Sequence, residues 1–433
     1  MRKDETEASA WRGSGTARLA GVLAGLFLAL LAFTGQALAQ THLKVFAANF
    51  PKIDVLRALA NAYSQARPGL TIEIETGGAT LESQQQALNA LLGARDAGVD
   101  LVMVDVLRIP QWALGQWLEP LDGLFGPERE ALLARLFPAY RQAALAGGRL
   151  MAVPYSADAQ AMLVRGDLLE KHGLAVPTTQ AALREAATRI LAAENQPTLR
   201  AIDLSSAPVE SSVCTAAMAL WGTGHDLVTE GKPALLTDPA RRALQGLQAL
   251  KDAKLLPVPP GEGHPERIRL AMQAGSLVFG HGWSYAWQRM QTDIDSVVAG
   301  KVRLVPVPGE TEDRASSCAG GWMVGVTAFS GRKVEALAFL RYLASPEAAR
   351  LQAELGDLPA QTGPYQDATI VAARPFLGQM GAVLAVARLR PQSARYSEVS
   401  DIVRTNLSAF MAGSKTAEAA LQDMQARLSL IFR

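Results

Sequence analysis

This chain has few of the residues on which metal, disulfide or nucleophilic chemistry depends. Its only cysteines, Cys214 and Cys318, are too few for a disulfide framework, so the fold must rely on its core. The five histidines are scattered without H-x-x-x-H spacing, and no C-x-x-C pair is present. The sequence also lacks a G-x-x-x-x-G-K-[ST] phosphate loop and a G-x-G-x-x-G dinucleotide fingerprint. We therefore expect neither a cofactor nor a metal.

Charge of either sign is also scarce. Charged residues make up 19% of the 433 residues, with 42 basic against 41 acidic side chains. Four of the basic and three of the acidic residues precede residue 40, so the rest of the chain is formally neutral. This balance gives no reason to expect nucleic acid or anionic lipid as a partner. With 49% hydrophobic residues, the chain is long enough for two cores, and we expect two domains.

One apolar run without a charge stands near the N-terminus, from Leu19 to Phe33. The run is shorter than the roughly 20 apolar residues that a membrane-spanning helix needs. Basic residues precede it, and Ala37-Leu38-Ala39 follows as an A-x-A cleavage site. This layout predicts a signal peptide over 1–39, cleaved after Ala39, and hence a periplasmic protein that is not embedded in the membrane. An uncleaved N-terminal anchor is the alternative. No cysteine stands directly after the run, where it could carry a lipid.

Strand-like and helix-like segments alternate after the apolar run. Leu43 to Ala48 and Thr71 to Glu75 read as strands, and a helical stripe that includes Leu56 lies between them. A second helix, near Ser83 to Ala94, leads to the apolar run Leu101 to Val106. Strand–helix–strand order of this kind predicts an α/β fold with a parallel sheet covered by helices.

The segment from Ala271 to Met290 concentrates aromatic residues. Leu277 to Phe279 read as a short buried strand, and we expect a glycine turn at Gly280 and Gly282. Three rings follow within five residues, at Trp283, Tyr285 and Trp287. Since positions two apart point in different directions on a helix, one buried helical face cannot take all three. The rings could form the wall of a cleft or cap a core near a sheet edge, and this segment alone leaves both open.

The same segment contains the nearest match to an enzyme motif. Gly282 to Ala286 resembles the G-x-S-x-G nucleophile elbow around Ser284. No histidine follows Ser284, so the order Ser…Asp…His of that class cannot be completed. Asp105 and Asp158 each lie beside an apolar run and could be cleft carboxylates or structural caps.

Binding of a neutral polyol fits the residues that remain. Trp283, Tyr285 and Trp322 could cover the apolar faces of a sugar, and carboxylates could accept its hydroxyl hydrogens. Gly320 and Gly321, just before Trp322, would let backbone amides come close to a ligand.

Six segments, taken in order, resemble the extracellular solute-binding proteins of ABC-type sugar importers, in particular the trehalose/maltose-binding branch. The resemblance runs from Leu43 to the last helix. The segments are VDLVMVDVLRIPQWALGQWLEPLD (99–122), GRLMAVPYSADAQAMLVRGDLLEKHG (148–173), AMQAGSLVFGHGWSYAW (271–287), CAGGWMVGV (318–326), FLRYLASPEAA (339–349) and RPQSARYSEVSDIVR (390–404).

The resemblance implies a set of ligand contacts, with Glu82 and Gln85 as further candidates in a segment where family members have polar contacts. The implied contacts are Asp105, Asp158, Trp283, Tyr285, Gly320, Gly321, Trp322 and Arg390. Two departures leave the exact sugar open. Ser156, next to Tyr155, stands where these binders have a tyrosine and is taken as a candidate contact in its place. Gln85 or Gln86 stands where they have an arginine.

The resemblance also implies the architecture and the partners. We expect the two-lobe periplasmic-binding-protein fold with a three-crossing hinge, with lobe one over 40–152 and 302–345 and lobe two over 153–301 and 346–433. The protein would be a monomer and no enzyme, and it would deliver a mono- or disaccharide, of α-linked, glucose-containing type, to ABC permease subunits. A glycoside hydrolase with two cleft carboxylates and a binder of peptides or polyamines are the rival interpretations.

The resemblance further suggests that the two cysteines remain free thiols. It places Cys318 in lobe one and Cys214 in lobe two, so a bond between them would pin the lobes together and oppose release of the ligand.

Overall fold

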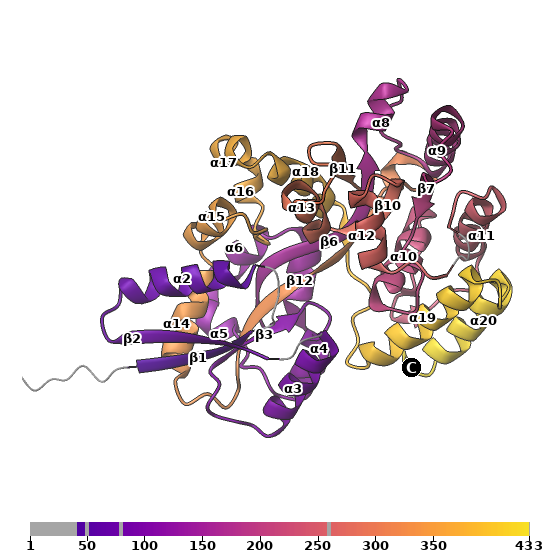
Figure 1. Cartoon of the computed structure of the whole chain (residues 1–433). Coiled ribbons are helices and arrows are strands. Elements are labelled where there is room, and N and C mark those ends of the chain that lie inside the picture. The colour runs from indigo at the N-terminus through magenta and orange to yellow at the C-terminus, as the bar shows by residue number, and fades with distance from the viewer. Residues whose placement is uncertain (1–40, 48–51, 78–80, 258–260, 433) are drawn as a thin grey trace, which may run out of the picture.

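The computed structural model describes residues 41–47, 52–77, 81–257 and 261–432, and its main feature is one mixed sheet. The strands lie in the order β2-β1-β3-β12-β6-β10-β7, with β11 paired to β6 and β13 paired to β12. Helices gather in two groups, one around β1 to β3 and one around β7 and β10 (Figure 1). The chain therefore forms two α/β lobes joined by a shared sheet.

The first lobe is built on parallel strands, as the sequence predicts. β1 (Thr41–Ala47) pairs in parallel with β2 (Leu70–Thr76) and with β3 (Leu101–Asp105). Two helices of the predicted order, α2 (Ile53–Gln65) and α3 (Leu81–Gly93), connect these strands. The apolar stripe of α2 is buried, which explains why this segment folds as a helix against the sheet.

Two long antiparallel strands join the lobes. The first part of β6 (Val153–Arg165) pairs with β12 (Ser317–Val326), whose second half pairs with β3 in the first lobe. The last part of β6 pairs instead with β10 (Leu277–Trp283) and β11 (Val302–Val305). Each strand therefore begins in one lobe and ends in the other.

A third connection runs through the helices after residue 345. α15 (Pro346–Glu354) packs against α2 of the first lobe, whereas α18 (Pro375–Ala385) packs against β11 and β6. α19 (Tyr396–Met411) then packs on α10 (Glu210–Gly222) in the second lobe. These crossings fit the expected hinge, and the numerical lobe boundaries stay a prediction.

The remaining elements cover the two lobes or form short connections. The other strands are β4 (Leu145–Ala146), β5 (Arg149–Leu150), β7 (Arg200–Asp203), β8 (Val228–Thr229), β9 (Lys232–Pro233) and β13 (Ala387–Arg388). The other helices are α4 (Ile109–Leu114), α5 (Asp122–Phe125), α6 (Arg129–Ala134), α7 (Pro138–Ala143), α8 (Gly166–Lys171), α9 (Gln180–Glu194), α11 (Asp238–Asp252), α12 (Pro265–Gln273), α13 (Ser284–Thr292), α14 (Lys333–Leu343), α16 (Gly363–Gln366), α17 (Ala368–Ala373) and α20 (Ala417–Leu428), with 3₁₀ turns η1 (Gly126–Glu128) and η2 (Glu312–Arg314).

The glycine turn expected at Gly280 and Gly282 is wrong, because β10 continues through both glycines to Trp283. An added Cβ would lie 2.8 Å from Ile268 at Gly280 and 2.3 Å from Leu163 at Gly282. The glycines therefore allow close packing of neighbours on a strand and do not mark a turn.

The expectation of two free thiols is also wrong. Cys214 and Cys318 form a disulfide with their Cα atoms 5.5 Å apart. Cys318 stands at the start of β12, opposite Gln160 of β6 and before β12 reaches β3. The bond therefore ties α10 to β12 at the second-lobe end of the hinge, and it does not pin one lobe to the other.

The predicted signal peptide, 1–39, and its cleavage after Ala39 lie outside the described residues. Within the part of the chain that the structure describes, no helix combines the length and the apolar character needed to cross a membrane.

Candidate functional site

The residues predicted to bind the ligand lie where β6 and β12 run side by side. Gly320 is opposite Asp158, and Trp322 is opposite Ser156. Directly opposite residues of an antiparallel pair project from the same face, and so do residues two apart on one strand. The register therefore gathers these four residues on one face of the sheet at the hinge.

The neighbouring strands add two more predicted residues to these four, and we call the six residues together the row. Trp322 also pairs with Asp105 at the end of β3, and Trp283 at the end of β10 pairs with Gln160. The ring of Trp283 lies so close to Gly320 that a Cβ there would come within 2.6 Å of the ring atom Cζ3. Glycine at position 320 is thus what lets the indole come this close to the strand.

A pocket opens at this row, with about 480 Å³ of empty space that includes solvent-open volume. Among the predicted residues it is lined by Ser156, Asp158, Tyr285 and Trp322. Sequence reasoning did not predict the rest of the lining, which comes from five separate parts of the chain. These further residues are Lys52, Ala157, Ser284, Gln288, Gly356, Asp357, Leu358 and Phe376.

Asp158 is a partly buried carboxylate that lines the pocket. Its Oδ1 accepts hydrogen bonds from the backbone amides of Ala159 at 2.8 Å and Ser284 at 3.0 Å, and from the Ser284 hydroxyl. Burial raises the pKa of Asp158 to about 6, although these hydrogen bonds favour the ionised form. Since the bonds fall on Oδ1, the other oxygen can accept a ligand hydroxyl.

Ser156 leads to a second carboxylate. Its hydroxyl donates to Oδ1 of Asp357 at 3.0 Å, and Gln352 donates to Oδ2 at 2.7 Å. Burial raises the pKa of Asp357 as well. Ser156, at the position where the resemblance implies a tyrosine, is therefore tied to the segment after α15, a contact that only the folded chain reveals.

The hinge strands are fixed in place by Tyr140 of α7. Its hydroxyl lies 2.7 Å from the carbonyl oxygen of Asp158 and 2.9 Å from that of Gly320, and it accepts from the Asp158 amide at 3.0 Å. One buried phenol thus joins the two strands beside the pocket.

Asp105 takes the capping role of the two that the sequence leaves open, and its role as a cleft carboxylate stays a prediction. Its Oδ1 accepts from the Leu107 amide at 2.9 Å, which is a local capping bond. Burial raises its pKa, while the charges of Arg390 and Arg108 lower it. Its place opposite Trp322 also puts it at the row, and direct ligand contact stays a prediction.

Arg390 and Trp283 are both held by the first turn of α10. Arg390 is 2% exposed and donates to Glu210 and, at 3.0 Å, to the carbonyl of Ala319. Trp283 donates its indole N–H to Ser211 at 2.9 Å, and the Arg390 guanidinium lies 6.0 Å from the Trp283 ring centroid. Arg390 therefore lies beside the ring of Trp283, which belongs to the predicted aromatic wall of the cleft. Contact of Arg390 with a ligand stays a prediction.

Glu82 and Gln85 lie in α3 of the first lobe. The structure does not describe their side chains, so their predicted contacts stay open. Gly321 adjoins the row with φ of +117°, and its carbonyl accepts from the Val106 amide at 3.2 Å.

The arrangement around Ser284 does not suit nucleophilic catalysis. Its hydroxyl is bonded to Asp158, and the nearest histidine in sequence, His281, contacts Thr215 at 3.0 Å instead. Burial lowers the pKa of His281 to about 3. In the described ranges, no cluster of three or more His, Cys, Asp or Glu side chains could hold a metal ion.

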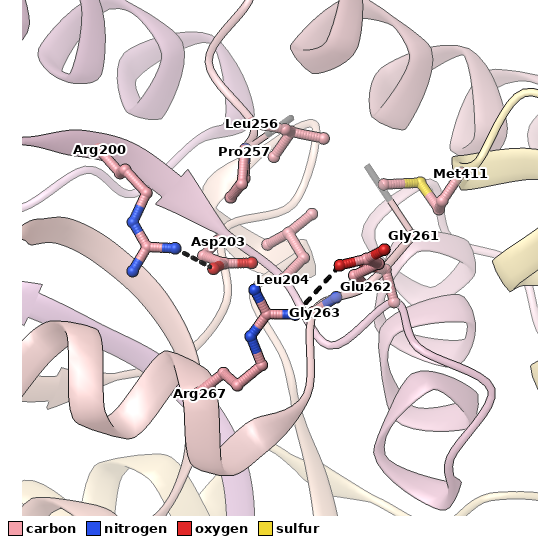
Figure 2. Close-up of a pocket in the computed structure, with 11 residues that line it drawn as sticks. Arg200, Asp203, Leu204, Leu256, Pro257, Gly261, Glu262, Gly263, Arg267 and Met411 are labelled. Carbon is pink, nitrogen blue, oxygen red and sulfur yellow. Dashed lines mark hydrogen bonds and ion pairs between the residues drawn. The ribbon is translucent and has the colours of Figure 1, made fainter. Parts of the chain in front are cut away.

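Another pocket lies away from the row, in the second lobe (Figure 2). It contains the ion pairs Arg200–Asp203 at 3.2 Å and Arg267–Glu262 at 3.2 Å. None of the predicted contacts lines it, and the charges in it are already paired.

Comparison with known proteins agrees with this geometry. Residues 47–350 match the family model described as bacterial extracellular solute-binding protein. A probable ABC transporter-binding protein of Deinococcus radiodurans is 29% identical over 351 residues, which cover 78% of this chain and 81% of that protein. A mannitol-binding protein of Pseudomonas aeruginosa is 23% identical over 343 residues, 74% of each chain.

Solved structures show the same fold. Maltose-bound MalE3 of T. maritima superposes with a TM-score of 0.77 at 27% identity, covering 90% of this chain and 99% of that one. The sugar-binding protein MalE of Xanthomonas citri has the same TM-score at 19% identity, over 90% and 97% of the two chains. The predicted family is confirmed, whereas its trehalose/maltose branch stays a prediction. The chain belongs to the bacterial extracellular solute-binding proteins, a family of binding proteins.

Proposed function

We propose that this protein is a periplasmic receptor that captures a mono- or disaccharide between its two lobes and delivers it to the permease subunits of an ABC importer. The observation that carries the proposal is the row across β3, β12, β6 and β10. It combines rings, carboxylates and glycines at the junction of the lobes. Rings cover the apolar faces of a sugar while carboxylates accept its hydroxyl hydrogens.

The sugar class has further support. The matched relatives include a protein named for mannitol and a structure that holds maltose. We propose an α-linked, glucose-containing disaccharide as the ligand, because the sequence segments resemble the trehalose/maltose branch. We also propose that the exported protein acts as a monomer and binds its sugar unchanged.

A ligand panel tests this function. Maltose, trehalose, glucose and mannitol, together with a short peptide and a polyamine, would be screened by thermal shift and titrated by calorimetry. A ligand that binds only the native state raises the melting temperature, by an amount set by its concentration relative to Kd. Binding of a peptide or polyamine without any sugar would refute the proposal, and turnover of a bound glycoside on long incubation would favour the hydrolase.

Sugar affinity is expected to fall as the pH is lowered through about 6. Above this pKa the ionised Asp158 accepts ligand hydroxyls, and below it the protonated carboxyl accepts them less well. Because the ligand favours the ionised form, Kd should rise about 10-fold between pH 7.5 and pH 5, as expected one unit below the pKa. Calorimetric titrations across this range measure the effect.

The control for this pH dependence is Asp158→Asn, which should bind more weakly and with a flat pH profile. Other groups that face the pocket include Asp357, whose pKa burial also raises, and Tyr285, whose pKa burial raises to about 12. Tyr285 stays neutral throughout. A pH dependence that persists in Asp158→Asn would assign the effect to Asp357.

A further inference from the structure

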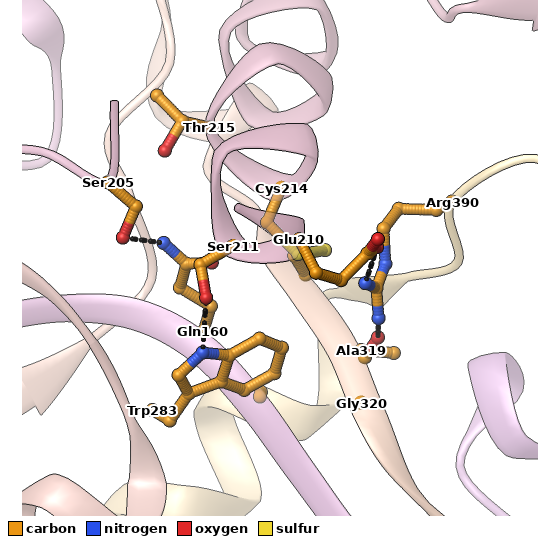
Figure 3. The surroundings of a disulfide bond; sticks show 12 residues. Gln160, Ser205, Glu210, Ser211, Cys214, Thr215, Trp283, Ala319, Gly320 and Arg390 are labelled. Carbon is orange, nitrogen blue, oxygen red and sulfur yellow. Dashed lines mark hydrogen bonds and ion pairs between the residues drawn. A yellow bond between two sulfur atoms is a disulfide. The ribbon is translucent and has the colours of Figure 1, made fainter. Parts of the chain in front are cut away.

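The disulfide lies directly beside the aromatic wall of the proposed cleft. Cys214 stands in the second turn of α10, Cys318 stands at the start of β12, and both are fully buried. Cys318 pairs with Gln160, which in turn pairs with Trp283, so the cysteine shares the sheet face of the row. Figure 3 shows α10 passing over this face.

The first turn of α10, just before Cys214, provides the partners of two predicted ligand contacts. Ser211 accepts the indole N–H of Trp283 at 2.9 Å. Glu210 accepts hydrogen bonds from Arg390 and also from Tyr396 and Ser400 of α19. The position of this turn therefore sets the orientation of the Trp283 ring and the Arg390 guanidinium.

Cys318 is followed by two residues that contact Arg390 and Trp283. Ala319 accepts from Arg390 at 3.0 Å, and Gly320 lies against the ring of Trp283. Trp283 and Arg390 are thus enclosed between the first turn of α10 and the start of β12 (Figure 3). Cys214–Cys318 is the covalent link between these two segments.

We propose that the Cys214–Cys318 disulfide positions the sugar-binding wall, by holding the first turn of α10 against β12 so that Ser211 and Glu210 fix Trp283 and Arg390. The proposal rests on the proposed function, because the wall is defined by its ligand. Without the bond, α10 can shift on the sheet, and the two side chains must be ordered again when the sugar binds. Ordering one or two side chains on binding corresponds to about 10-fold in affinity.

The test compares the full-length exported protein with its Cys214→Ala/Cys318→Ala variant. Calorimetry with the best sugar of the panel should give a Kd about 10-fold higher for the variant. The matched control is Val213→Ala, which truncates a fully buried side chain next to Cys214 in α10 but leaves the bond intact. The control should lower the melting temperature with little change in Kd.

A double-mutant cycle with Ser211→Ala separates positioning from general stability. If the bond acts through the Ser211–Trp283 contact, removing it in the Ser211→Ala background should raise Kd by less than about threefold, because contacting sites are not additive. The proposal would be overturned if loss of the bond raised Kd by the same factor in the wild type and in Ser211→Ala. An unchanged Kd in the double cysteine variant would also overturn it.

Hydrogen exchange tests the proposal without a ligand. Loss of the bond should speed exchange in residues 208–216 and 281–285, and Val213→Ala should leave 281–285 unchanged. Unchanged exchange at 281–285 in the cysteine variant would also overturn the proposal. If the wild-type protein binds no sugar, the proposed function fails, and exchange still decides whether the bond holds the wall.

Discussion

Trp283→Ala and Trp322→Ala are each expected to weaken sugar binding by at least about 2 kcal/mol, roughly 30-fold, as for buried aromatic anchors at other binding sites. Trp322 lines the pocket and stands in register with Asp105 and Ser156. The Trp283 ring contacts Gly320, which lies two residues before Trp322 on β12. Each ring presents a large apolar face at little entropic cost, and alanine provides no surface for the sugar ring.

The matched control is Trp117→Ala. The Trp117 ring centroid lies 6.4 Å from that of Trp112, and its indole packs under Gly115, where an added Cβ would lie 3.0 Å from it. This ring is part of the first-lobe packing near α4 and lies outside the pocket lining. Its removal should lower stability and leave the sugar Kd within about threefold of the wild type.

Calorimetric titration of the three variants, each first shown to be folded by circular dichroism, measures the difference. Equal losses for Trp117, Trp283 and Trp322 would show that the row is packing and that the ligand lies elsewhere. A loss at Trp322 alone would restrict the cleft to the pocket and give Trp283 a supporting role.

The family could be predicted from the sequence because six segments, taken in order, resemble it, and the residues of the row are among the contacts that this resemblance implies. The strand–helix alternation at the start of the chain predicts the parallel part of the sheet, and it is confirmed. Asp105 ends an apolar run and stands at the end of β3, whereas Trp322, which follows two glycines, lies in the middle of β12. Strand ends that meet at a sheet junction are natural places for a ligand.

Other parts of the site depend on pairing between distant segments and could not be predicted. Asp357 lines the pocket and bonds with Ser156, although the two residues are 201 positions apart in sequence. The disulfide was missed for a related reason. The order of segments along the chain suggested separate lobes for the two cysteines, whereas the register of β12 with β6 puts them together.

The glycines of β10 show a different limit. Gly280 and Gly282 read as a turn because glycine is common in turns, but here they prevent clashes with Ile268 and Leu163. A sequence shows that a position is glycine without showing which neighbour requires it. Gly320 and Gly321 do allow close approaches, to the Trp283 ring and to the Ser156 carbonyl, and the expected approach of their amides to a ligand stays a prediction.

Gly321→Ala is expected to be strongly destabilising. Its φ of +117° lies in a region that L side chains rarely adopt, and an added Cβ would lie 2.3 Å from the carbonyl oxygen of Ser156. The clash is with the backbone of the paired strand, so no side chain can rotate away to relieve it. Backbone strain of this kind costs about 1–3 kcal/mol, and the clash adds to it, so a loss of about 3 kcal/mol or more is expected.

Gly331→Ala is the matched control for this change. Gly331 has no heavy atom within 4 Å of an added Cβ and no positive φ, so alanine there should alter stability by less than about 1 kcal/mol in either direction. Urea unfolding followed by circular dichroism compares the two variants. Because Gly321 precedes Trp322 on β12 and pairs with Ala157, the residue before Asp158 on β6, any folded Gly321→Ala protein should also bind sugar weakly. Equal unfolding midpoints for Gly321→Ala, Gly331→Ala and the wild type would mean that β12 does not take this close path past Ser156, and the register that builds the cleft would then be wrong.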